Sequence, residues 1–329
     1  MIEVKNLTKQ YGIISAISDI NFSINEGEVV GFLGPNGAGK TTTMNIITGC
    51  IAPTSGEALI DGVDIIEEPE RAKMNIGYLP DTPPVYGDMR VNEYLNFVAE
   101  IKKVRSGRKE MIKQVMEEVN IEDCGRRLIK NLSRGYRQRV GLAQAIIGWP
   151  KVIIMDEPTI GLDPKQIIEM REVVKRLGKK HTVILSSHIM QEVSAVCDRL
   201  LIINKGKIVA QGTPEGLAGE IQNTGGIKVI VKGDQKAVKR ALSEFPQITT
   251  KDAVIGKEEG TTELNLICEG SADIDIREVA FRCMAKNDFP ILLMKPNELT
   301  LEEVFLSITA GDRLGFGAQE GGKIDEGDI

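Results

Sequence analysis

The chain has 329 residues, of which 42% are hydrophobic, 27% charged and only 4% aromatic, and its net charge is −6. This length suits two or three domains, and the composition is that of an ordinary globular protein, which excludes a fibrous repeat or a wholly disordered chain. The negative charge argues against a protein that coats nucleic acid, although it leaves room for a local basic groove. No apolar run approaches the roughly 18 residues that span a bilayer, and the five cysteines are scattered. We therefore expect a cytosolic protein, which could still act at a membrane.

Residues 1 to about 84 are predicted to be rich in strands. The segments MIEVKNL, SDINFSIN and GEALIDG alternate apolar and polar residues and are separated by turn residues. Between them, EVVGFLG is an almost continuous apolar run, which is typical of a strand covered on both faces. It ends in glycines and leads into KTTTMNIITG, where we expect a helix.

Helices are predicted from residue 88 to about 150. VNEYLNFVAEIKKV places Val91, Leu95, Val98 and Ile101 on one helical face, and KEMIKQVMEEVN repeats the pattern. From residue 150 onward, the apolar strands KVIIMD, TVILSS and RLLIIN alternate with helical stretches. This alternation predicts a mostly parallel sheet that is covered by helices.

A second, smaller unit is predicted after the segment KIVAQGTPEGLAGEI. Its predicted elements are strand 227–232, helix 234–245, strands 249–256 and 261–268, helix 274–287 and strand 290–295. The order βαββαβ is that of the ferredoxin-like plan. We place the domains at 1–220 and 221–310, and interpret the Gly-rich, acidic residues 311–329 as a disordered tail.

The segment GPNGAGKTT fits the phosphate-loop pattern G-x-x-x-x-G-K-[ST] between a predicted buried strand and a predicted helix. Glycines let the loop turn with its backbone N–H groups facing inward, and the helix N-terminus adds positive potential. Lys40 would reach the β- and γ-phosphates, and the Thr41 hydroxyl would bind Mg²⁺. The alternative, a chance glycine-rich turn, is disfavoured by this context. The residues predicted to contact nucleotide here are Gly34, Pro35, Asn36, Gly37, Ala38, Gly39, Lys40, Thr41 and Thr42.

Two predicted strands end in side chains that suit phosphate chemistry. KVIIMDE ends in Asp156, which could hold Mg²⁺ through water, and Glu157, which could polarise an attacking water. TVILSSH ends at His188, which could donate to a γ-phosphate oxygen. Either feature alone would be structural, but a phosphate loop in the same chain favours the functional interpretation. His181, in the turn KKHT, is expected to be an exposed surface residue.

Together these segments resemble the ATP-binding subunit of ABC transporters over residues 2–220, two-thirds of the chain. GPNGAGKT resembles the Walker A loop of that family, VIIMDE its Walker B strand, GLD at 161–163 its D-loop, and His188 its switch histidine. LSRGY at 132–136 stands where the family has its Leu-Ser-Gly-Gly-Gln signature. This variant, with IGYLPD and TLEEVF, resembles the subfamily of drug, polysaccharide and gliding-motility exporters.

The resemblance implies an α/β P-loop NTPase fold with a mixed sheet core and a helical subdomain at about 85–150, in addition to the small α+β ferredoxin-like domain. It implies that Tyr11 stacks on adenine, and that Ser133 and Gly135 close on the γ-phosphate held by a second subunit, with Asp163 communicating across that interface. ATP would then join a head-to-tail dimer of two copies of this chain, or of this chain and a paralogue. The implied cofactors are ATP and Mg²⁺. Separate transmembrane permease subunits are the implied partners, at the cytoplasmic face of the membrane, and no nucleic acid is expected.

Two sites depart from the family pattern. Asp81 replaces the glutamine of the Q-loop, and it is shorter and charged but can still offer an oxygen to Mg²⁺. In the signature, Arg134 replaces a glycine and Tyr136 the glutamine, whereas Ser133 and Gly135 remain. Arg134 would either add positive charge or point to solvent.

Three functions are consistent with these features. The first is an ATPase that drives a membrane exporter, with PPVYGDM at 83–89 receiving a partner helix; the same segment could instead be a proline-stiffened surface loop. The second is a non-transport ABC-type ATPase of translation or DNA repair, but those classes have two cassettes per chain or a long coiled coil, and neither is found here. The third, a regulatory binding module, rests only on the fold of the C-terminal unit.

Overall fold

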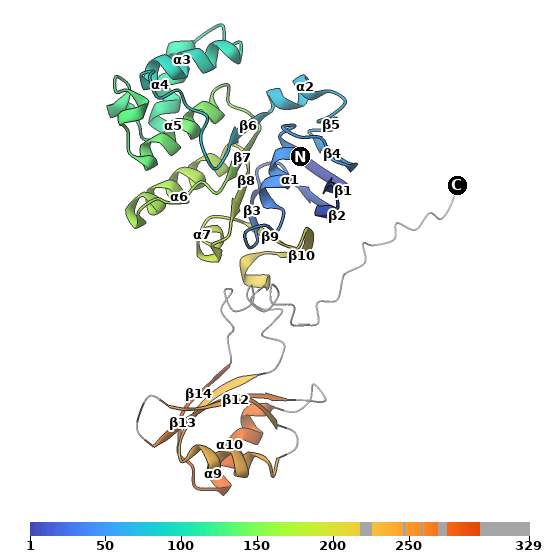
Figure 1. Ribbon diagram of the computed structural model, residues 1–329. Coiled ribbons are helices and arrows are strands. Elements are labelled where there is room, and N and C mark those ends of the chain that lie inside the picture. Colours follow the sequence, from blue (N-terminus) through green and yellow to red (C-terminus); the bar gives the residue numbers. More distant parts are fainter. Residues whose placement is uncertain (218–225, 246–247, 257, 259, 269–274, 297–329) are drawn as a thin grey trace, which may run out of the picture. The chain divides into compact units, whose positions relative to one another are not determined.

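A computed structural model describes the chain except for residues 218–225, 246–247, 257, 259, 269–274 and 297–329 (Figure 1). The described residues form two compact units, the first built from Met1–Pro214 and the second from within Glu215–Ser307. The boundary predicted at residue 220 and the tail predicted at 311–329 lie outside the described residues. Among the helices that are described, none has the length and apolar character needed to cross a membrane.

The first unit is centred on a six-stranded sheet. Its strands, in spatial order, are β10 (Lys207–Gly212), β9 (Arg199–Asn204), β3 (Val29–Leu33), β8 (Thr182–Ser187), β7 (Val152–Asp156) and β6 (Ile76–Leu79). Neighbouring strands are parallel except for the pair β9 and β10. Every residue of β3, β7 and β8 is buried, as the apolar runs predict for strands covered on both faces. Their carboxyl ends meet at one edge of the sheet, where ligands of such folds bind.

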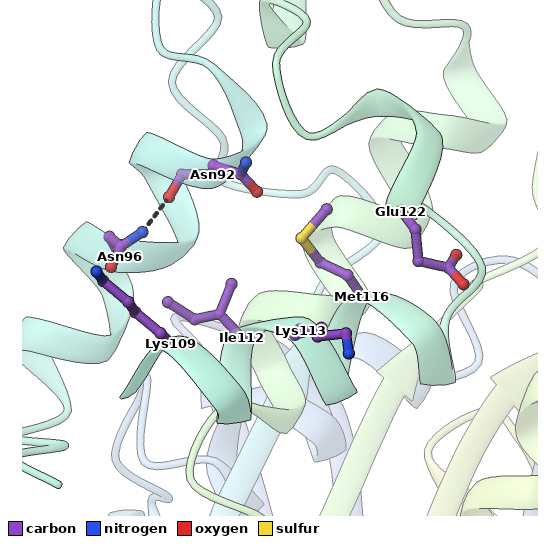
Figure 2. A pocket seen from close by; sticks show the side chains of 7 residues that line it. All are labelled: Asn92, Asn96, Lys109, Ile112, Lys113, Met116 and Glu122. Carbon is purple, nitrogen blue, oxygen red and sulfur yellow. Dashed lines mark hydrogen bonds between the residues drawn. The ribbon is translucent and has the colours of Figure 1, made fainter. Parts of the chain in front are cut away.

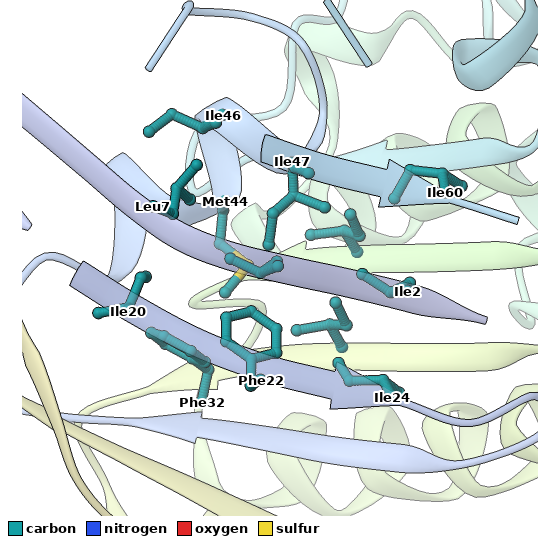
Figure 3. Packing of buried hydrophobic residues seen from close by; sticks show 14 of the residues in the cluster. Ile2, Leu7, Ile20, Phe22, Ile24, Phe32, Met44, Ile46, Ile47 and Ile60 are labelled. Carbon is teal, nitrogen blue, oxygen red and sulfur yellow. The ribbon is translucent and has the colours of Figure 1, made fainter. Parts of the chain in front are cut away.

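A second, antiparallel sheet packs over the first helix. Its strands are β2 (Ile14–Ile24), β1 (Ile2–Tyr11), β4 (Ser55–Ile60) and β5 (Val63–Asp64). Helix α1 (Lys40–Ile47) contacts β2 and β4 on one side and β7 on the other. Figure 3 shows Met44 and Ile47 of α1 among the apolar side chains of this core, where Phe22 and Phe32 lie with ring centres 5.8 Å apart. Packing on both sides therefore fixes the helix that begins at Lys40.

Helices dominate between β6 and β7, as predicted. They are α3 (Val91–Ile101), α4 (Arg108–Glu118) and α5 (Arg134–Ile146), with short 3₁₀ turns at Glu122–Cys124 and Ile129–Asn131. Of the four apolar residues that the sequence places on one face of α3, Val91, Leu95 and Val98 are buried, whereas Ile101, the last residue of the helix, is 61% exposed. The next residue, Lys102, turns its ammonium group to the carbonyls of Gln144, Ala145 and Ile147 at 2.8–3.0 Å, and so caps the end of α5.

Other helices of this unit are α2 (Pro69–Met74), α6 (Pro164–Gly178) and α7 (Met190–Ser194). Helix α6 packs on β8, and α7 packs on β3 and β8. The expectation that His181 is exposed is wrong. Its side chain is only 6% exposed, its Nδ1 lies 2.7 Å from the carbonyl oxygen of Pro150, and its ring stacks on Trp149 with centres 6.1 Å apart. His181 is therefore part of the packed interior, although Lys179 and Lys180 before it in the same turn are exposed.

The second unit has the predicted order of elements. They are β11 (Ile227–Lys232), α9 (Gln235–Leu242), β12 (Ile248–Ile255), β13 (Thr261–Cys268), α10 (Ile276–Lys286) and β14 (Ile291–Pro296). The antiparallel sheet has the order β12-β13-β11-β14, and both helices lie on one face of it (Figure 1). Each helix begins one or two residues later than predicted because Asp234 and Asp275 cap the N-termini through side-chain oxygens. Helix α9 also ends earlier than predicted, at Leu242. This arrangement is ferredoxin-like.

Candidate nucleotide site

The loop between β3 and α1 has the backbone that the phosphate-loop pattern requires. Gly39 has a φ of +111° at the N-terminus of α1, and a Cβ on it would lie 2.8 Å from the carbonyl oxygen of Ala16. A Cβ on Gly34 would lie 2.4 Å from the carbonyl oxygen of Ile203. Only glycine fits either position without moving backbone. The outer part of the loop is open, since Asn36 and Gly37 are exposed, whereas Ala38 is buried, and Pro35 and Thr42 are partly buried.

Lys40 lies inside this loop. Its side chain is buried, and Nζ donates to the carbonyl oxygens of Gly34 at 2.8 Å and Pro35 at 3.3 Å. The same ammonium group lies 3.2 Å from Oε1 of Glu157. Lys40 thus joins the glycine loop to the end of β7, and a phosphate group in the loop would meet this positive charge.

Asp156, the last residue of β7, is almost completely buried. Burial raises the pKa of its carboxyl group, and hydrogen bonds from the hydroxyls of Ser186 and Thr41 oppose that rise. The Ser186 hydroxyl also accepts the backbone N–H of Glu157 at 3.0 Å. Ser186 therefore holds both strand-end acids from the neighbouring strand β8.

Glu157 and His188 face each other at the ends of neighbouring strands. Nδ1 of His188 lies 2.9 Å from Oε2 of Glu157, whose other oxygen faces Lys40. Glu157 has a φ of +49°, in the left-handed region that residues other than glycine seldom adopt, and its side chain is buried. Such strained residues gather at functional sites, which is consistent with the roles predicted for this pair.

The donor atoms around Thr41 and Asp156 suit Mg²⁺. The two side chains are hydrogen-bonded to each other, and both offer hard oxygen ligands. Among the described residues, no group of three or more His, Cys, Asp or Glu side chains could hold a metal ion alone. A site with one or two protein ligands fits Mg²⁺, which is commonly completed by water and substrate phosphates.

Asp81 is exposed just after β6. Burial raises the pKa of the nearby Tyr78 hydroxyl, and the negative charges of Asp156 and Asp81 raise the pKa of Tyr78 further. Both acids therefore lie near Tyr78. The assignment of Asp81 as a metal ligand stays a prediction.

The signature and D-loop residues lie at the N-termini of α5 and α6. Ser133 caps α5 by accepting the backbone N–H of Tyr136 at 3.3 Å, and Asp163 caps α6 by accepting that of Gln166 at 2.9 Å. A Cβ on the buried Gly135 would lie 2.4 Å from Oε1 of Gln166. In the described chain, no hydrogen bond or ion pair joins Ser133 or Asp163 to Lys40 or the strand-end acids. Within one subunit, the described residues thus show no direct polar contact between the two groups of predicted site residues.

Arg134 was predicted either to add positive charge or to point to solvent, and its side chain contacts the D-loop while it remains exposed. Its guanidinium group packs on the D-loop, since a Cβ on Gly161 would lie 2.6 Å from it, although Arg134 itself remains exposed. Tyr11, the residue predicted to stack on adenine, ends β1 and is 51% exposed. The ammonium group of Lys9 lies 5.3 Å from the centre of its ring.

Comparisons with known proteins decide the family. The family described as "ABC transporter" matches residues 17–160. The uncharacterized ABC transporter ATP-binding protein YhcH of Bacillus subtilis (strain 168) is 42% identical over 211 residues, which are 64% of this chain and 68% of that protein. The linearmycin resistance ATP-binding protein LnrL of the same organism is 32% identical over 314 residues, 94% of this chain and 98% of that protein. The chain belongs to the ABC transporter ATP-binding proteins.

A solved structure supports the same conclusion for the fold of this ABC ATPase. The dimeric, post-hydrolysis structure of the ATP-binding cassette MJ0796 bound to ADP and Pi has a TM-score of 0.60 and 26% identity, covering 65% of this chain and 98% of that one. The predicted P-loop fold of an ABC-type ATPase is therefore confirmed, and the chain is an ATP-binding, ATP-hydrolysing protein as predicted.

Sequence reasoning assigned no role to four polar residues beside the site of this ABC ATPase. They are Thr159, Ser186, Ser187 and Glu192, all buried. The sequence does point to Ser186 and Ser187, because in the segment TVILSSH these adjacent serines end an apolar strand immediately before His188. The signal for Glu192 was weaker, because a single acid in a short helix is usually a surface residue.

A cavity of about 340 Å³ lies elsewhere, between α3 and α4 (Figure 2). Ile112 and Met116 line it together with Asn92 and Asn96, whose side-chain amide donates to the carbonyl oxygen of Asn92 at 2.8 Å. None of the predicted site residues lines this cavity.

Proposed function

We propose that this chain is the ATP-hydrolysing subunit of a membrane exporter, working as a head-to-tail dimer at the cytoplasmic face of the membrane. The exporter role rests on the likeness to LnrL, a linearmycin resistance ATP-binding protein matched over nearly the whole of both chains. The hydrolytic role rests on one arrangement of charges, in which the carboxylate of Glu157 bridges Lys40 and His188.

Each of these three residues has a distinct task in the proposal. Lys40 holds the β- and γ-phosphates inside the glycine loop, where backbone N–H groups share the negative charge. Glu157 orients the attacking water and accepts its proton, and His188 donates to a γ-phosphate oxygen through the ring nitrogen that does not face Glu157. Water, leaving group and charge would then be aligned as phosphoryl transfer requires.

Thr41 and Asp156 would hold Mg²⁺, which neutralises charge that develops on the phosphate oxygens when it is bound. The burial that raises the pKa of Asp156 favours this assignment, because a bound cation offsets the cost of keeping its carboxylate charged. Asp81 would add a further oxygen from outside the strand ends. The nucleotide base would stack on the free face of Tyr11.

In the proposed dimer, each ATP is completed by the partner. Ser133, Gly135 and Asp163 lie at the N-termini of α5 and α6, and none of them is among the polar partners of the Lys40 side chain in the described residues of their own chain. A helix N-terminus with a serine cap suits an anion, and the γ-phosphate held by the second subunit is the anion proposed here. That second subunit is either a second copy of this chain or a paralogue.

The surface proposed to receive the permease includes the segment 83–89. Tyr86 is 54% exposed and makes edge contacts with Tyr94 and Phe97 of α3, with ring centres 6.0 and 5.7 Å away. Phe97 is 39% exposed, so an aromatic patch reaches the surface of the helical subdomain. Exposed aromatic side chains of this kind are favourable anchors for a partner helix.

The experiment is an affinity capture from detergent-solubilised native membranes with the full chain as bait. We expect recovery of a protein with several membrane spans, and loss of that protein when Tyr86→Glu is the bait. The matched control is Phe281→Glu, which adds the same charge at a 59% exposed aromatic residue of the second unit. Recovery of ribosomes or DNA ends with no membrane protein would instead favour the alternative, a non-transport ABC-type ATPase.

A further inference from the structure

Glu192 of α7 is a buried acid beside the nucleotide site that the proposed mechanism does not use. Its side chain is 5% exposed, and its neighbours in the helix, Met190 and Val193, are buried apolar residues. The same oxygen, Oε2, accepts hydrogen bonds from the hydroxyl of Thr159 and from that of Ser187 at 3.3 Å. One carboxylate oxygen therefore binds two hydroxyl groups from different strand ends.

The two hydroxyl groups belong to the segments that carry the proposed catalytic pair. Thr159 lies two residues after Glu157, in a turn closed by the N–H of Ile160 on the carbonyl oxygen of Glu157 at 3.2 Å. Its own carbonyl oxygen accepts the N–H of Leu162 at 3.1 Å, at the entrance to the D-loop.

On the other side, Ser187 directly precedes His188. The Ser187 hydroxyl accepts the N–H of Ile189 at 3.0 Å while it donates to Glu192. Glu192 thus stabilises the backbone on both sides of His188, and at the same time holds the turn that follows Glu157.

Packing alone does not explain an acid at this position. Burying a carboxylate is unfavourable unless hydrogen bonds compensate it, and a leucine of similar size would fill the space without that cost. What a leucine cannot do is fix the spacing of two loops by accepting from both. Such spacing matters for catalysis, because an error of about 1 Å in the position of a reacting group can slow a reaction by about 100-fold.

We propose that Glu192 is a positioning residue for hydrolysis, which holds the segment of Glu157 and the segment of His188 at their working separation. In this proposal Glu192 acts on the reaction through Thr159 and Ser187, the two residues that its carboxylate binds. The inference rests on the catalytic roles proposed above for Glu157 and His188. It requires that Glu192 set the rate of hydrolysis and leave ATP binding, which depends on Lys40 and the glycine loop, unchanged.

The test compares Glu192→Leu and Glu192→Gln in the full-length protein, with kcat measured at saturating Mg-ATP and the ATP dissociation constant measured by equilibrium binding. We expect Glu192→Leu to lower kcat by about 10-fold to 100-fold while the dissociation constant changes less than about twofold. Glu192→Gln retains an oxygen that accepts from both hydroxyls and should restore kcat to within about threefold of the wild type. Ser194→Ala is the matched control, since that hydroxyl donates only within α7, to the carbonyl oxygen of Met190.

Several results would overturn the proposal. The first is a folded Glu192→Leu variant whose kcat equals that of the wild type. The second is a variant in which kcat, ATP affinity and melting temperature all fall together and Glu192→Gln restores none of them. If Glu192→Leu does not fold, Thr159→Val replaces it, and an unchanged kcat there would have the same meaning. Glu157→Gln is measured in parallel. Full hydrolytic activity of Glu157→Gln would refute the catalytic roles proposed for Glu157 and His188. If Glu157→Gln loses activity while Glu192→Leu is fully active, only the role of Glu192 is refuted.

Discussion

Nζ of Lys40 lies 3.2 Å from Oε1 of Glu157, and both side chains are buried at the edge of the central sheet. The ammonium group that is expected to bind phosphate is therefore shared with the carboxylate that is expected to activate water. His188 binds the other oxygen of the same carboxylate. The charge on Glu157 thus influences both the affinity for the phosphates and the chemistry performed on them.

Replacing Glu157 with glutamine should separate these two effects. Glu157→Gln keeps the shape of the side chain but removes the base and the charge that competes for Lys40. We expect kcat for ATP hydrolysis to fall by about 100-fold or more, with ATP affinity equal to or higher than that of the wild type. Steady-state hydrolysis and equilibrium nucleotide binding measure the two quantities. Glu172→Gln, which removes an exposed partner of Lys175, is the matched control and should change neither.

Two glycines of the site should respond differently to alanine, although a Cβ on either would meet an atom at 2.4 Å. At Gly34 that atom is the backbone oxygen of Ile203, so Gly34→Ala must displace the loop or β9. At Gly135 it is the end of the flexible Gln166 side chain, which can move aside. We expect Gly34→Ala to lower the free energy of unfolding by about 1–3 kcal/mol and to weaken ATP binding at least tenfold. Gly135→Ala should change the free energy of unfolding by less than about 1 kcal/mol and leave monomer binding intact. Denaturant unfolding measures the stability of each variant, and nucleotide titration measures its ATP affinity. A Gly135→Ala variant less stable than Gly34→Ala would contradict the glycine-loop geometry.

Ser133→Ala should weaken ATP-driven dimerisation without weakening ATP binding by the monomer. The substitution removes the cap of α5, which costs about 0.5–2 kcal/mol of stability, and it removes a hydroxyl proposed to face the partner's nucleotide. Light scattering with ATP, in the hydrolysis-deficient Glu157→Gln background, measures the dimer fraction. Asp234→Ala removes an equivalent cap from α9 in the second unit and is the matched control. A parallel loss of monomer binding in Ser133→Ala would contradict the assignment of Ser133 to the partner's ATP.

Asp81→Gln restores the residue that the family has in its Q-loop, and it should retain ATPase activity. Asp81 is exposed, so the longer side chain can be accommodated, and its amide oxygen can still approach a hard cation. Asp81→Ala, which offers no oxygen, should raise the Mg²⁺ concentration needed for half-maximal hydrolysis. The two variants are compared in one Mg²⁺ titration of hydrolysis. Loss of all hydrolysis in Asp81→Gln would show that the Q-loop assignment is wrong.

The features that sequence predicted well are those determined by local pattern. The buried strands β3, β7 and β8 follow from apolar runs, and the loop before Lys40 follows from its glycine spacing. The features it missed depend on contacts between distant segments. Glu192 is buried because two strand ends supply donors to it, and His181 is buried because Trp149 and Pro150 cover it. Similarly, the contact of Arg134 with Gly161 arises where two helices meet, which no pattern within either segment records.

The buried His181 should make the stability of the first unit depend on pH. Its Nδ1 donates to the carbonyl oxygen of Pro150, and its Nε2 is buried without a hydrogen-bond partner among the described residues, so the neutral ring fits and a second proton does not. Burial accordingly lowers its pKa below the ordinary 6.5. Because the unfolded chain then binds the proton more tightly, the stability that neutral His181 contributes is complete above about pH 6.5 and is lost as the pH falls below that value.

We expect the free energy of unfolding of the wild type to fall, relative to His181→Asn, by up to about 1.4 kcal/mol per pH unit below that value. Asparagine is chosen because its amide can still donate to Pro150. Trp149, the only tryptophan of the chain, stacks on His181, so its fluorescence reports unfolding of this unit in denaturant titrations at several pH values. The difference between the two proteins should be constant from pH 7.5 to 8.5, which serves as the control interval. Parallel curves down to pH 5.5 would contradict a depressed pKa for His181.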